Sequence, residues 1–264
     1  MSAAPDQRDE AGPFDIIGDV HGCCDELEVL LARLGYGVRI SGRNTVIKAS
    51  PGRRAIFVGD FIDRGPRSIE VLRIAMAMVE AGQALAVLGN HDVKLMRWLD
   101  GRNIQLTHGL AQTVEQMQAE PETFRHRVKA FLESLPYHLW LDDGRLAVAH
   151  AGIREDMLGR TSGSVQAFCL YGDTTGEKDE LGLPVRRNWA ANYRGKAAII
   201  HGHTPLAEAQ WQNNTICIDT GCCFGGKLTA LRWPERELVS VPAARMYTAP
   251  ARPLGAGAGL SGGQ

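Results

Sequence analysis

The sequence predicts a single α/β domain, and three observations lead to this prediction. The chain has 264 residues with 44% apolar content, enough for one large core. Short apolar runs alternate with segments whose apolar residues recur at helical spacing. We find no internal repeat and no change of composition that would mark a second domain. The domain is expected to span residues 14–243, between a mobile polar tail at 1–13 and a disordered Ala/Gly/Pro-rich tail at 244–264.

Strands are predicted from short apolar runs that end at glycine or at a polar residue. In chain order these runs are residues 14–17, 55–58, 84–88, 146–149, 197–200, 215–218, 227–232 and 237–241. Helices are predicted where apolar residues form one helical stripe. These segments are residues 25–34, 68–81, 90–99 and two patterns within 104–140, which Pro121 divides and Pro136 ends.

The helix ends and the remaining connections are predicted from local sequence signals. Asp25 and Glu28 fit a capping box, and Ser68 fits the N-cap of the next helix. The polar stretch 36–53 is expected to form a hairpin or a loop. Residues 159–195 are rich in Gly, Thr and Asp and only weakly periodic, so a long functional loop is predicted there.

Charge and composition narrow the classes of function and the compartment. The formal net charge of −1 gives no general case for nucleic-acid binding. No apolar run approaches the roughly 20 residues of a membrane span, and the first residues lack the features of a signal peptide. The six cysteines lack C-x-x-C spacing, which favours reduced thiols in a cytoplasmic protein over a disulfide framework or a zinc ribbon. These cysteines are Cys23, Cys24, Cys169, Cys217, Cys222 and Cys223.

The motif GDFIDRG at 59–65 is the centre of the predicted site. It places two carboxylates, Asp60 and Asp63, and the guanidinium of Arg64 directly after an apolar strand. Acids and an arginine at a strand end suit a site that holds cations and a phosphate. Other predicted strands end in the same way, at Asp19, His21, Asn90, His91, His150, His201, His203 and Asp219.

A single Asp or His after a strand is more often a turn residue than a ligand. The repetition, next to glycine each time, reverses that expectation. Ligand sites gather where strands end, because the loops converge there. Oxygen and imidazole donors without a thiolate suit two divalent ions, and manganese, nickel, cobalt, iron and zinc all remain open.

The motifs GDVHG, GDFIDRG, GNHD, AHAG and HGHTP resemble those of the binuclear metallophosphoesterases, in the branch shared with serine/threonine protein phosphatases. Longer stretches, including LYGDTTGEKD and CIDTGCCFGGKLTALRWPERELVSVP, resemble the PrpE-type bis(5′-nucleosyl)-tetraphosphatases of bacteria. They also resemble the phosphatase module of bacterial polynucleotide kinase-phosphatase. The resemblance covers roughly residues 14–243. It implies a calcineurin-like β-sandwich of mixed sheets flanked by helices.

The resemblance also implies roles for individual residues. Asp19 and His21 would hold a first metal, Asp60 would bridge both metals, and Asn90, His150 and His203 would complete the second. Because Pro205 stands where the wider superfamily often has a further His, the first metal is expected to have fewer protein ligands and more water. His201 is the weakest candidate ligand.

A carboxylate that spans two cations lets them act together on one water, which then attacks phosphorus. His91 is expected to be the general acid, oriented by Asp63, and Arg64 would grip the phosphate. Asp219, Arg186 and Arg187 are the further candidates for substrate binding, although the arginines fit solvated loop charges equally well.

The expected activity is asymmetric hydrolysis of diadenosine tetraphosphate to ATP and AMP. Three alternatives stay open: a phosphatase for 3′-phosphate or 2′,3′-cyclic phosphate ends of nucleic acids, a protein phosphatase, and a non-catalytic nucleotide sensor. The remaining polar and aromatic candidates are expected to have ordinary structural roles. They are His108, His126, His138, Trp189 and Trp211.

Overall fold

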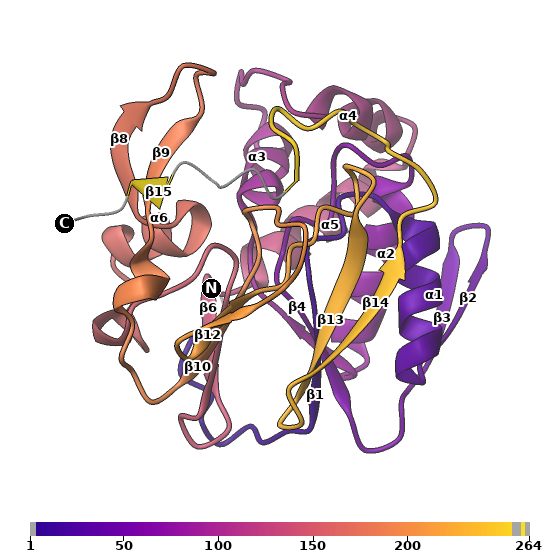
Figure 1. Ribbon diagram of the computed structural model, residues 1–264. Coiled ribbons are helices and arrows are strands. Elements are labelled where there is room, and N and C mark those ends of the chain that lie inside the picture. The colour runs from indigo at the N-terminus through magenta and orange to yellow at the C-terminus, as the bar shows by residue number, and fades with distance from the viewer. Residues whose placement is uncertain (1–3, 255–259, 262–264) are drawn as a thin grey trace.

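Two five-stranded sheets form the centre of the molecule (Figure 1). The computed structural model describes residues 4–254 and 260–261. The first sheet has the order β14-β13-β1-β4-β5, and the second has the order β11-β12-β10-β7-β6. The strands of the first sheet are β1 Phe14–Ile17, β4 Arg54–Phe57, β5 Ala84–Ala86, β13 Lys227–Trp233 and β14 Glu237–Pro242. The strands of the second sheet are β6 His138–Leu141, β7 Leu146–Ala149, β10 Ala198–His201, β11 Trp211–Gln212 and β12 Thr215–Cys217.

Each sheet has three neighbouring parallel strands with antiparallel partners beside them. In the first sheet β4 pairs in parallel with both β1 and β5, whereas β13 runs antiparallel to β1. In the second sheet β10 pairs in parallel with β7 and β12, whereas β6 and β11 are antiparallel edges. The carboxyl ends of the parallel strands in each sheet therefore lie at one edge, which is where the site is expected.

The core between the sheets explains why the parallel strands are largely apolar. Alternate side chains of a strand point to opposite faces, and both faces are covered here. Ile16 and Ile56 face the second sheet, while their neighbours Ile17 and Phe57 face the helices. In the second sheet Val148 and Ile200 contribute to the shared core. The polar candidate residues thus follow six strands that are themselves buried in the sheets.

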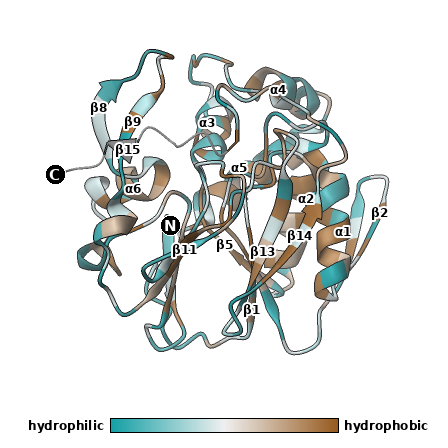
Figure 2. Cartoon of the chain, viewed as in Figure 1, coloured by the Kyte–Doolittle hydropathy of each residue, from teal (hydrophilic) through white to brown (hydrophobic). Residues whose placement is uncertain are grey.

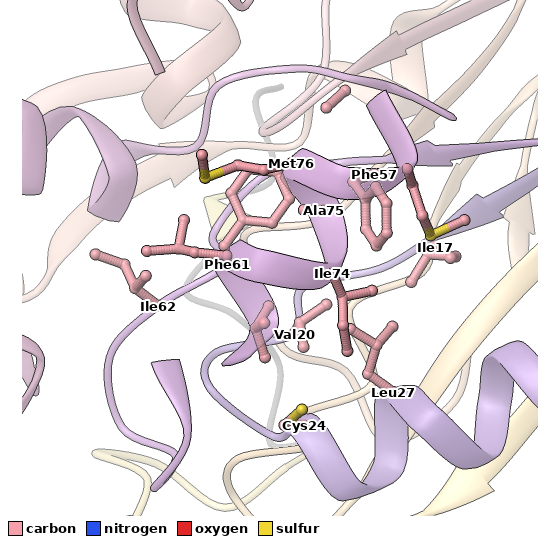
Figure 3. Close-up of a cluster of buried hydrophobic side chains, with 14 of the residues drawn as sticks. Ile17, Val20, Cys24, Leu27, Phe57, Phe61, Ile62, Ile74, Ala75 and Met76 are labelled. Carbon is pink, nitrogen blue, oxygen red and sulfur yellow. The ribbon is translucent and has the colours of Figure 1, made fainter. Parts of the chain in front are cut away.

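Helices cover the outer faces of both sheets. The helices are α1 Cys24–Leu34, α2 Ser68–Glu80, α3 Asn90–Leu99, α4 Leu110–Gln118, α5 Glu122–Ser134 and α6 Gly163–Tyr171, with 3₁₀ turns at Glu155–Met157 and Trp189–Asn192. Leu27 of α1 and Ile74 of α2 are fully buried close to Phe57 of the first sheet (Figure 3). Phe168 of α6 packs in the core on the outer face of the second sheet. Helix α1 combines hydrophobic and hydrophilic residues, whereas β8 is hydrophilic (Figure 2).

Several predicted elements were close to those of the structure, but the local signals for helix ends were partly wrong. Residues 14–17 and 146–149 form strands with the predicted bounds. Residues 36–53 contain the hairpin of β2 Gly37–Ser41 and β3 Asn44–Lys48. The N-cap of α1 is Cys23 without a side-chain cap, so no Asp25 capping box forms. Ser68 is the first residue of α2, and its hydroxyl instead accepts a bond from the Asp63 backbone N–H.

The predicted long loop at 159–195 is wrong, because most of this segment has regular structure. It contains α6 and the hairpin of β8 Thr174–Lys178 and β9 Pro184–Arg187. The helical signal was present: the hydroxyl of Ser162 accepts from the N–H of Val165, and the side chains of Val165, Phe168 and Cys169 are buried. The strand β6 at the edge of the second sheet was also missed.

Both chain ends contact the domain where the structure describes them. The backbone N–H of Gln7 donates to the carbonyl of Trp140, and that of Trp140 donates to Pro5, so residues 5–7 lie beside β6. Residues 244–254 cross the top of the molecule in Figure 1, and β15 Leu260–Ser261 pairs with β9. These contacts fall in the segments 1–13 and 244–264 that were predicted to be tails, of which residues 1–3, 255–259 and 262–264 lie outside the description. Within the described residues, no helix has the length and apolarity needed to cross a membrane.

Candidate active site

Residues from the ends of six parallel strands meet in one buried cluster. Asp60 is at its centre, because one oxygen, Oδ2, lies 3.5 Å from Nε2 of His21 and 3.4 Å from Nε2 of His150. Its other oxygen, Oδ1, accepts the backbone N–H of His91 at 2.9 Å. Asn90 joins the cluster through its Oδ1, which lies 2.9 Å from Nε2 of His150. The structure thus brings Asp60 and Asn90 to the same ring, that of His150.

The two histidines that face Asp60 present lone pairs to it. Nδ1 of His21 lies 2.8 Å from the carbonyl of Ile62, and Nδ1 of His150 lies 3.1 Å from the carbonyl of Val58. A carbonyl oxygen can only accept, so each ring carries its proton on Nδ1 and leaves Nε2 as an acceptor. This arrangement, in which a backbone carbonyl orients the ring, is typical of metal-binding histidines.

Burial keeps these rings neutral. Desolvation lowers the pKa of His150 to about 3, and burial together with the Arg64 charge lowers that of His21 well below its usual value. Neither ring therefore supplies a proton from Nε2 to the facing Asp60 oxygen. Acceptors that face one another in a buried site repel unless a cation lies between them.

Asp19 supplies a second reason to expect a cation. Its Oδ2 accepts the backbone N–H of His203 at 2.9 Å, but its buried Oδ1 has no hydrogen-bond partner in the described part of the chain. Burial, followed by repulsion from Asp219 and Asp60, raises its pKa well above the usual value. A Cβ added to Gly202 would lie 1.8 Å from that same Oδ1, so only glycine at this position leaves room for the oxygen.

The residues present therefore fit a binuclear metal centre. Potential ligand atoms of Asp60, His150 and His203 lie within 4.8 Å of one another, and so do those of His21, Asp60 and His91. Asp60 belongs to both groups, as expected for a bridging carboxylate. Carboxylate, amide and imidazole donors without sulfur suit manganese, iron, cobalt, nickel or zinc.

His91 and Asp63 form a buried pair beside this cluster. Nδ1 of His91 lies 2.5 Å from Oδ2 of Asp63, while Thr113 donates its hydroxyl to the other carboxylate oxygen at 2.6 Å. Burial, opposed by the Thr113 bond, raises the pKa of Asp63 to about 7. Burial and the neighbouring His21 lower the pKa of His91 well below its usual value, so the ring is neutral and its Nδ1–H points at Asp63.

Arg64 lies between two of the histidines. Its guanidinium donates to Nε2 of His21 at 2.6 Å and to Nε2 of His91 at 3.1 Å, and it lies over the ring of Phe224. The guanidinium is therefore in the cluster, where the sequence had placed it.

The two candidate arginines of the β8–β9 hairpin have different environments. Arg186 donates to Nε2 of His203 at 2.8 Å and to the carbonyl of Tyr171 at 3.1 Å. Arg187 pairs instead with Asp173 at 3.2 Å, and 59% of its side chain is exposed. The structure brings Arg186 into the cluster and leaves Arg187 outside it.

A cavity of about 350 Å³ opens beside the cluster. Arg64, Arg186 and His203 line it on the side of the metal centre, and Phe224 contributes an aromatic wall. Residues 248–254 form the opposite wall. This wall is held in place because Thr248 donates to the carbonyls of Cys223 and Arg64, and because Arg252 pairs with Asp179 of the hairpin.

The family to which the chain belongs indicates the chemistry of this cluster of metal-ligand residues. The model of the calcineurin-like phosphoesterases matches residues 12–207, which is most of the chain. The chain belongs to this family of metallophosphoesterases. It is a hydrolase of the bis(5′-nucleosyl)-tetraphosphatase type, as the following relatives indicate.

Curated relatives are similar over nearly their whole length. The chain is 48% identical over 240 residues to "Bis(5'-nucleosyl)-tetraphosphatase PrpE [asymmetrical]" of Anoxybacillus flavithermus, covering 89% of this chain and 96% of the relative. It is 44% identical over 238 residues to the Bacillus subtilis protein of the same name, with the same coverage. The sequence-based resemblance to PrpE-type enzymes is confirmed.

Solved structures share the metallophosphoesterase fold. A crystal structure described as a candidate diadenosine tetraphosphatase matches with a TM-score of 0.65 and 25% identity, over 92% of this chain and 99% of that one. A cold-active protein tyrosine phosphatase matches with a TM-score of 0.59 and 16% identity, over 95% and 83% of the two chains. The second likeness concerns the fold alone. The predicted fold of mixed sheets flanked by helices is confirmed.

Two residues of this metallophosphoesterase site were not among the candidates from the sequence. Asp92 is fully buried and accepts backbone N–H bonds from Asp60, Gly89 and Phe61, at 2.8, 2.9 and 3.1 Å. Thr113 is the residue that holds Asp63. A signal existed for Asp92, because an acid three residues after a glycine that precedes a helix fits an N3 capping position. No local signal marked Thr113, since α4 is brought to the site only by tertiary packing.

The loops of this site adopt unusual backbone conformations. His21, Asp60, Asp63, Arg64 and His203 all have positive φ, between 46° and 74°. Such values are uncommon for residues with a side chain and cost of order 1–3 kcal/mol each. Close packing holds them: a Cβ on Gly89 would lie only 2.1 Å from Oδ1 of Asp60.

The other histidines have mostly the ordinary roles expected of them. Gly159 donates its backbone N–H to Nε2 of the buried His138 at 3.0 Å. His126 is exposed on α5 near Glu122. His201 packs against Trp189 and lies outside both potential ligand groups. His108 lines the cavity together with Arg64.

Proposed function

We propose that this metallophosphoesterase hydrolyses diadenosine tetraphosphate asymmetrically, to ATP and AMP. The single observation that carries the proposal is the 48% identity to a PrpE-type asymmetrical bis(5′-nucleosyl)-tetraphosphatase over 96% of that protein's length. The buried cluster around Asp60 agrees with it, because it provides ligands for the metal ions such an enzyme uses. The substrate class proposed is therefore the dinucleoside polyphosphates.

We assign Asp19 and His21 to the first cation, Asn90, His150 and His203 to the second, and Asp60 to both. When bound, two divalent cations polarise the phosphoryl oxygens and lower the pKa of a shared water, so that hydroxide is available near neutral pH. The chain's own contribution is to fix the ligands before substrate arrives. The carbonyls of Ile62 and Val58 hold the His21 and His150 rings in the required tautomer.

His91 is proposed to protonate the leaving group. In the substrate-free protein its Nδ1–H points at Asp63, and its Nε2 accepts from Arg64. An arriving polyphosphate brings negative charge next to the ring and raises its pKa, so that Nε2 can take up a proton and deliver it. Asp63, held by Thr113, would stabilise the doubly protonated ring.

Arg64 and Arg186 are proposed to bind the phosphate chain. Both guanidiniums border the 350 Å³ cavity and at present donate to imidazole nitrogens. A guanidinium fork matches two phosphate oxygens, so we expect both groups to turn from the rings to the substrate. Asp219 is buried near Asp19 and Asp60, and burial raises its pKa to about 6. Its position suits support of the metal ligands better than contact with an anion.

Arg186 and Arg187 offer a matched pair of variants that tests this assignment. Arg186→Ala should raise KM for diadenosine tetraphosphate by at least about tenfold, because a charge-assisted bond to phosphate contributes roughly 1.5–3 kcal/mol. Arg187→Ala should leave KM within about twofold, because its guanidinium is exposed and pairs with Asp173. Steady-state kinetics on both variants would check this. Similar increases for both would show that Arg186 has no special role.

The reaction itself is tested by separating its products. Purified protein is supplied in turn with manganese, cobalt, nickel, iron or zinc and incubated with diadenosine tetraphosphate, and the nucleotides are resolved by ion-exchange chromatography. ATP and AMP in equal amounts are expected. Two ADP molecules, or no turnover with any metal, would overturn the proposal. Phosphate-ended RNA and a phosphopeptide are run in parallel, and a higher kcat/KM on either would replace the proposed substrate.

A further inference from the structure

A second group of potential metal ligands lies behind the loops of the active site. Cys23, Glu26 and Cys222 are almost completely buried, with exposures of 0%, 2% and 2%. One ligand atom from each lies within 4.8 Å of the other two. Cys23 immediately precedes α1, Glu26 is in the first turn of that helix, and Cys222 lies between β12 and β13. This group shares no residue with the cluster around Asp60.

The carboxylate of Glu26 is only half satisfied. Its Oε1 accepts from the backbone N–H of Ala244 and from the hydroxyl of Tyr247, both at 2.8 Å. Its Oε2 is buried and has no hydrogen-bond partner among the described residues. The nearby Cys23 thiol directs its proton to the carbonyl of His21, at 3.6 Å, rather than to this oxygen. An unpaired buried carboxylate oxygen costs of order 1–3 kcal/mol or more, so a partner is missing here.

We propose that Cys23, Glu26 and Cys222 bind a thiolate-preferring divalent cation of the zinc class, at a structural site separate from the catalytic centre. Two sulfurs and a carboxylate oxygen are accepted zinc ligands. The spacing of Cys23 and Glu26, three residues apart at the start of a helix, places both on one face. On binding, both thiols release their protons to solvent, and the cation together with two thiolates and one carboxylate carries a net charge of −1.

The site would connect three parts of the chain that are distant in sequence. Cys23 and Glu26 fix the start of α1, Cys222 fixes the β12–β13 connection, and Glu26 holds residues 244–247 through its other oxygen. His21 and Asp219 lie two and three residues before these cysteines. A cation here would therefore brace loops of the active site from behind. Because the ligands are buried, the cation would enter during folding.

Cobalt spectroscopy separates this site from the catalytic centre, whose proposed ligands contain no sulfur. Metal-free protein is refolded with Co²⁺, and the near-ultraviolet spectrum is recorded. A sulfur-to-cobalt charge-transfer band is expected in the wild type and should disappear in Cys222→Ser. Glu26→Gln keeps an oxygen for Ala244 and Tyr247 but loses the anionic charge. The affinity of the protein for Co²⁺, measured from the growth of this band, should therefore fall by at least about tenfold.

Cys169→Ser is the matched control, because this buried cysteine belongs to α6 and to a different core cluster, so the cobalt band of this variant should remain unchanged. The zinc content of the wild type should exceed that of Cys222→Ser by one ion per chain. Folded wild-type protein saturated with Co²⁺ that shows no sulfur band would overturn the proposal, whether or not any variant folds. So would a Cys23–Cys222 disulfide found by mass spectrometry in protein purified under air.

Discussion

At the scale of single residues, Asp60 is the position on which the metal centre depends most. Its Oδ2 faces the lone pairs of His21 and His150, and burial raises its pKa to about 7 in the metal-free protein. Asp60→Asn retains the Oδ1 that accepts from His91 but removes the negative charge that two cations would share. We expect both metals to be lost and kcat/KM to fall by more than the roughly 100-fold seen when the hydrogen-bond partner of a ligand is removed.

Metal analysis and kinetics on the purified variant check this expectation, and Asp15→Asn is the control. Asp15 is also a fully buried aspartate, but it lies in β1 and pairs with Arg53. Its substitution should lower stability and leave the metal content unchanged. An Asp60→Asn enzyme that keeps two metals and most of its activity would contradict the bridging role.

His91 can be tested through the leaving group. An alkyl phosphate releases a strongly basic alkoxide and needs a proton from a general acid, whereas p-nitrophenolate leaves readily without one. His91→Ala should therefore lower kcat on an alkyl phosphate such as phosphoserine by about 10²–10⁴-fold, the usual contribution of a general acid. The loss on p-nitrophenyl phosphate should be under about tenfold. Equal losses on the two substrates would assign His91 to metal binding, which its place in a ligand group with His21 and Asp60 also permits.

At the scale of elements, Asp92 joins the loop after β4 to the start of α3. Its carboxylate accepts three backbone N–H groups, and burial together with the Asp60 charge raises its pKa to about 8. Asp92→Asn would place an amide N–H₂ against at least one of these donors. We expect a loss of about 1–3 kcal/mol in unfolding free energy and a 10–100-fold weaker affinity for Mn²⁺.

Urea unfolding of the metal-free protein and a Mn²⁺ titration measure the two effects of Asp92→Asn separately. Asp100→Asn, at the other end of α3, should change stability by no more than about 0.5 kcal/mol, because Asp100 takes part in surface ion pairs with Lys129 and Arg102. If both variants behaved alike, the buried carboxylate would not be what holds the β4 loop.

Elements with strong local patterns were predictable from the sequence, and elements that depend on partners were not. The strands at 14–17 and 146–149 are apolar except at Asp15, because both of their faces are covered, so their bounds were clear. The hairpin β8–β9 lacks such a pattern, since its residues are largely exposed and form strands mainly by pairing with each other. The different environments of Arg186 and Arg187 could not be predicted either. Adjacent residues of a strand point to opposite sides, but the sequence had not predicted a strand there.

At the scale of the whole molecule, the site exists because two sheets bring their strand ends together. His21, Asp60 and Asn90 follow strands of the first sheet, while His150 and His203 follow strands of the second. Motif spacing predicted which residues would meet, because each motif follows a buried strand whose end is fixed. It could not predict Thr113 or the wall formed by residues 248–254, which reach the site through packing of α4 and of the C-terminal segment.

This concentration of buried acids links metal binding, pH and stability. In the metal-free protein, burial raises the pKa of Asp60 and Asp63 to about 7 and that of Asp219 to about 6. In the unfolded chain these groups have pKa values near 3.9. Between about pH 4 and pH 7 these three carboxyls therefore bind more protons in the folded state than in the unfolded state. Their contribution to the unfolding free energy falls as pH rises through this window, and the buried histidines, whose pKa values burial lowers, act in the opposite direction.

Bound cations remove this penalty, because they favour the ionised carboxylates that burial disfavours. The stabilisation by Mn²⁺ relative to a chelator should thus be small at pH 5 and larger at pH 8. We expect a difference of at least about 1 kcal/mol, which corresponds to less than one pKa unit of the shifts involved. Urea unfolding at both pH values, with Mn²⁺ and with chelator, measures it. A metal effect that is equal at the two pH values, or larger at pH 5, would mean that these acids are not the groups to which the cations bind.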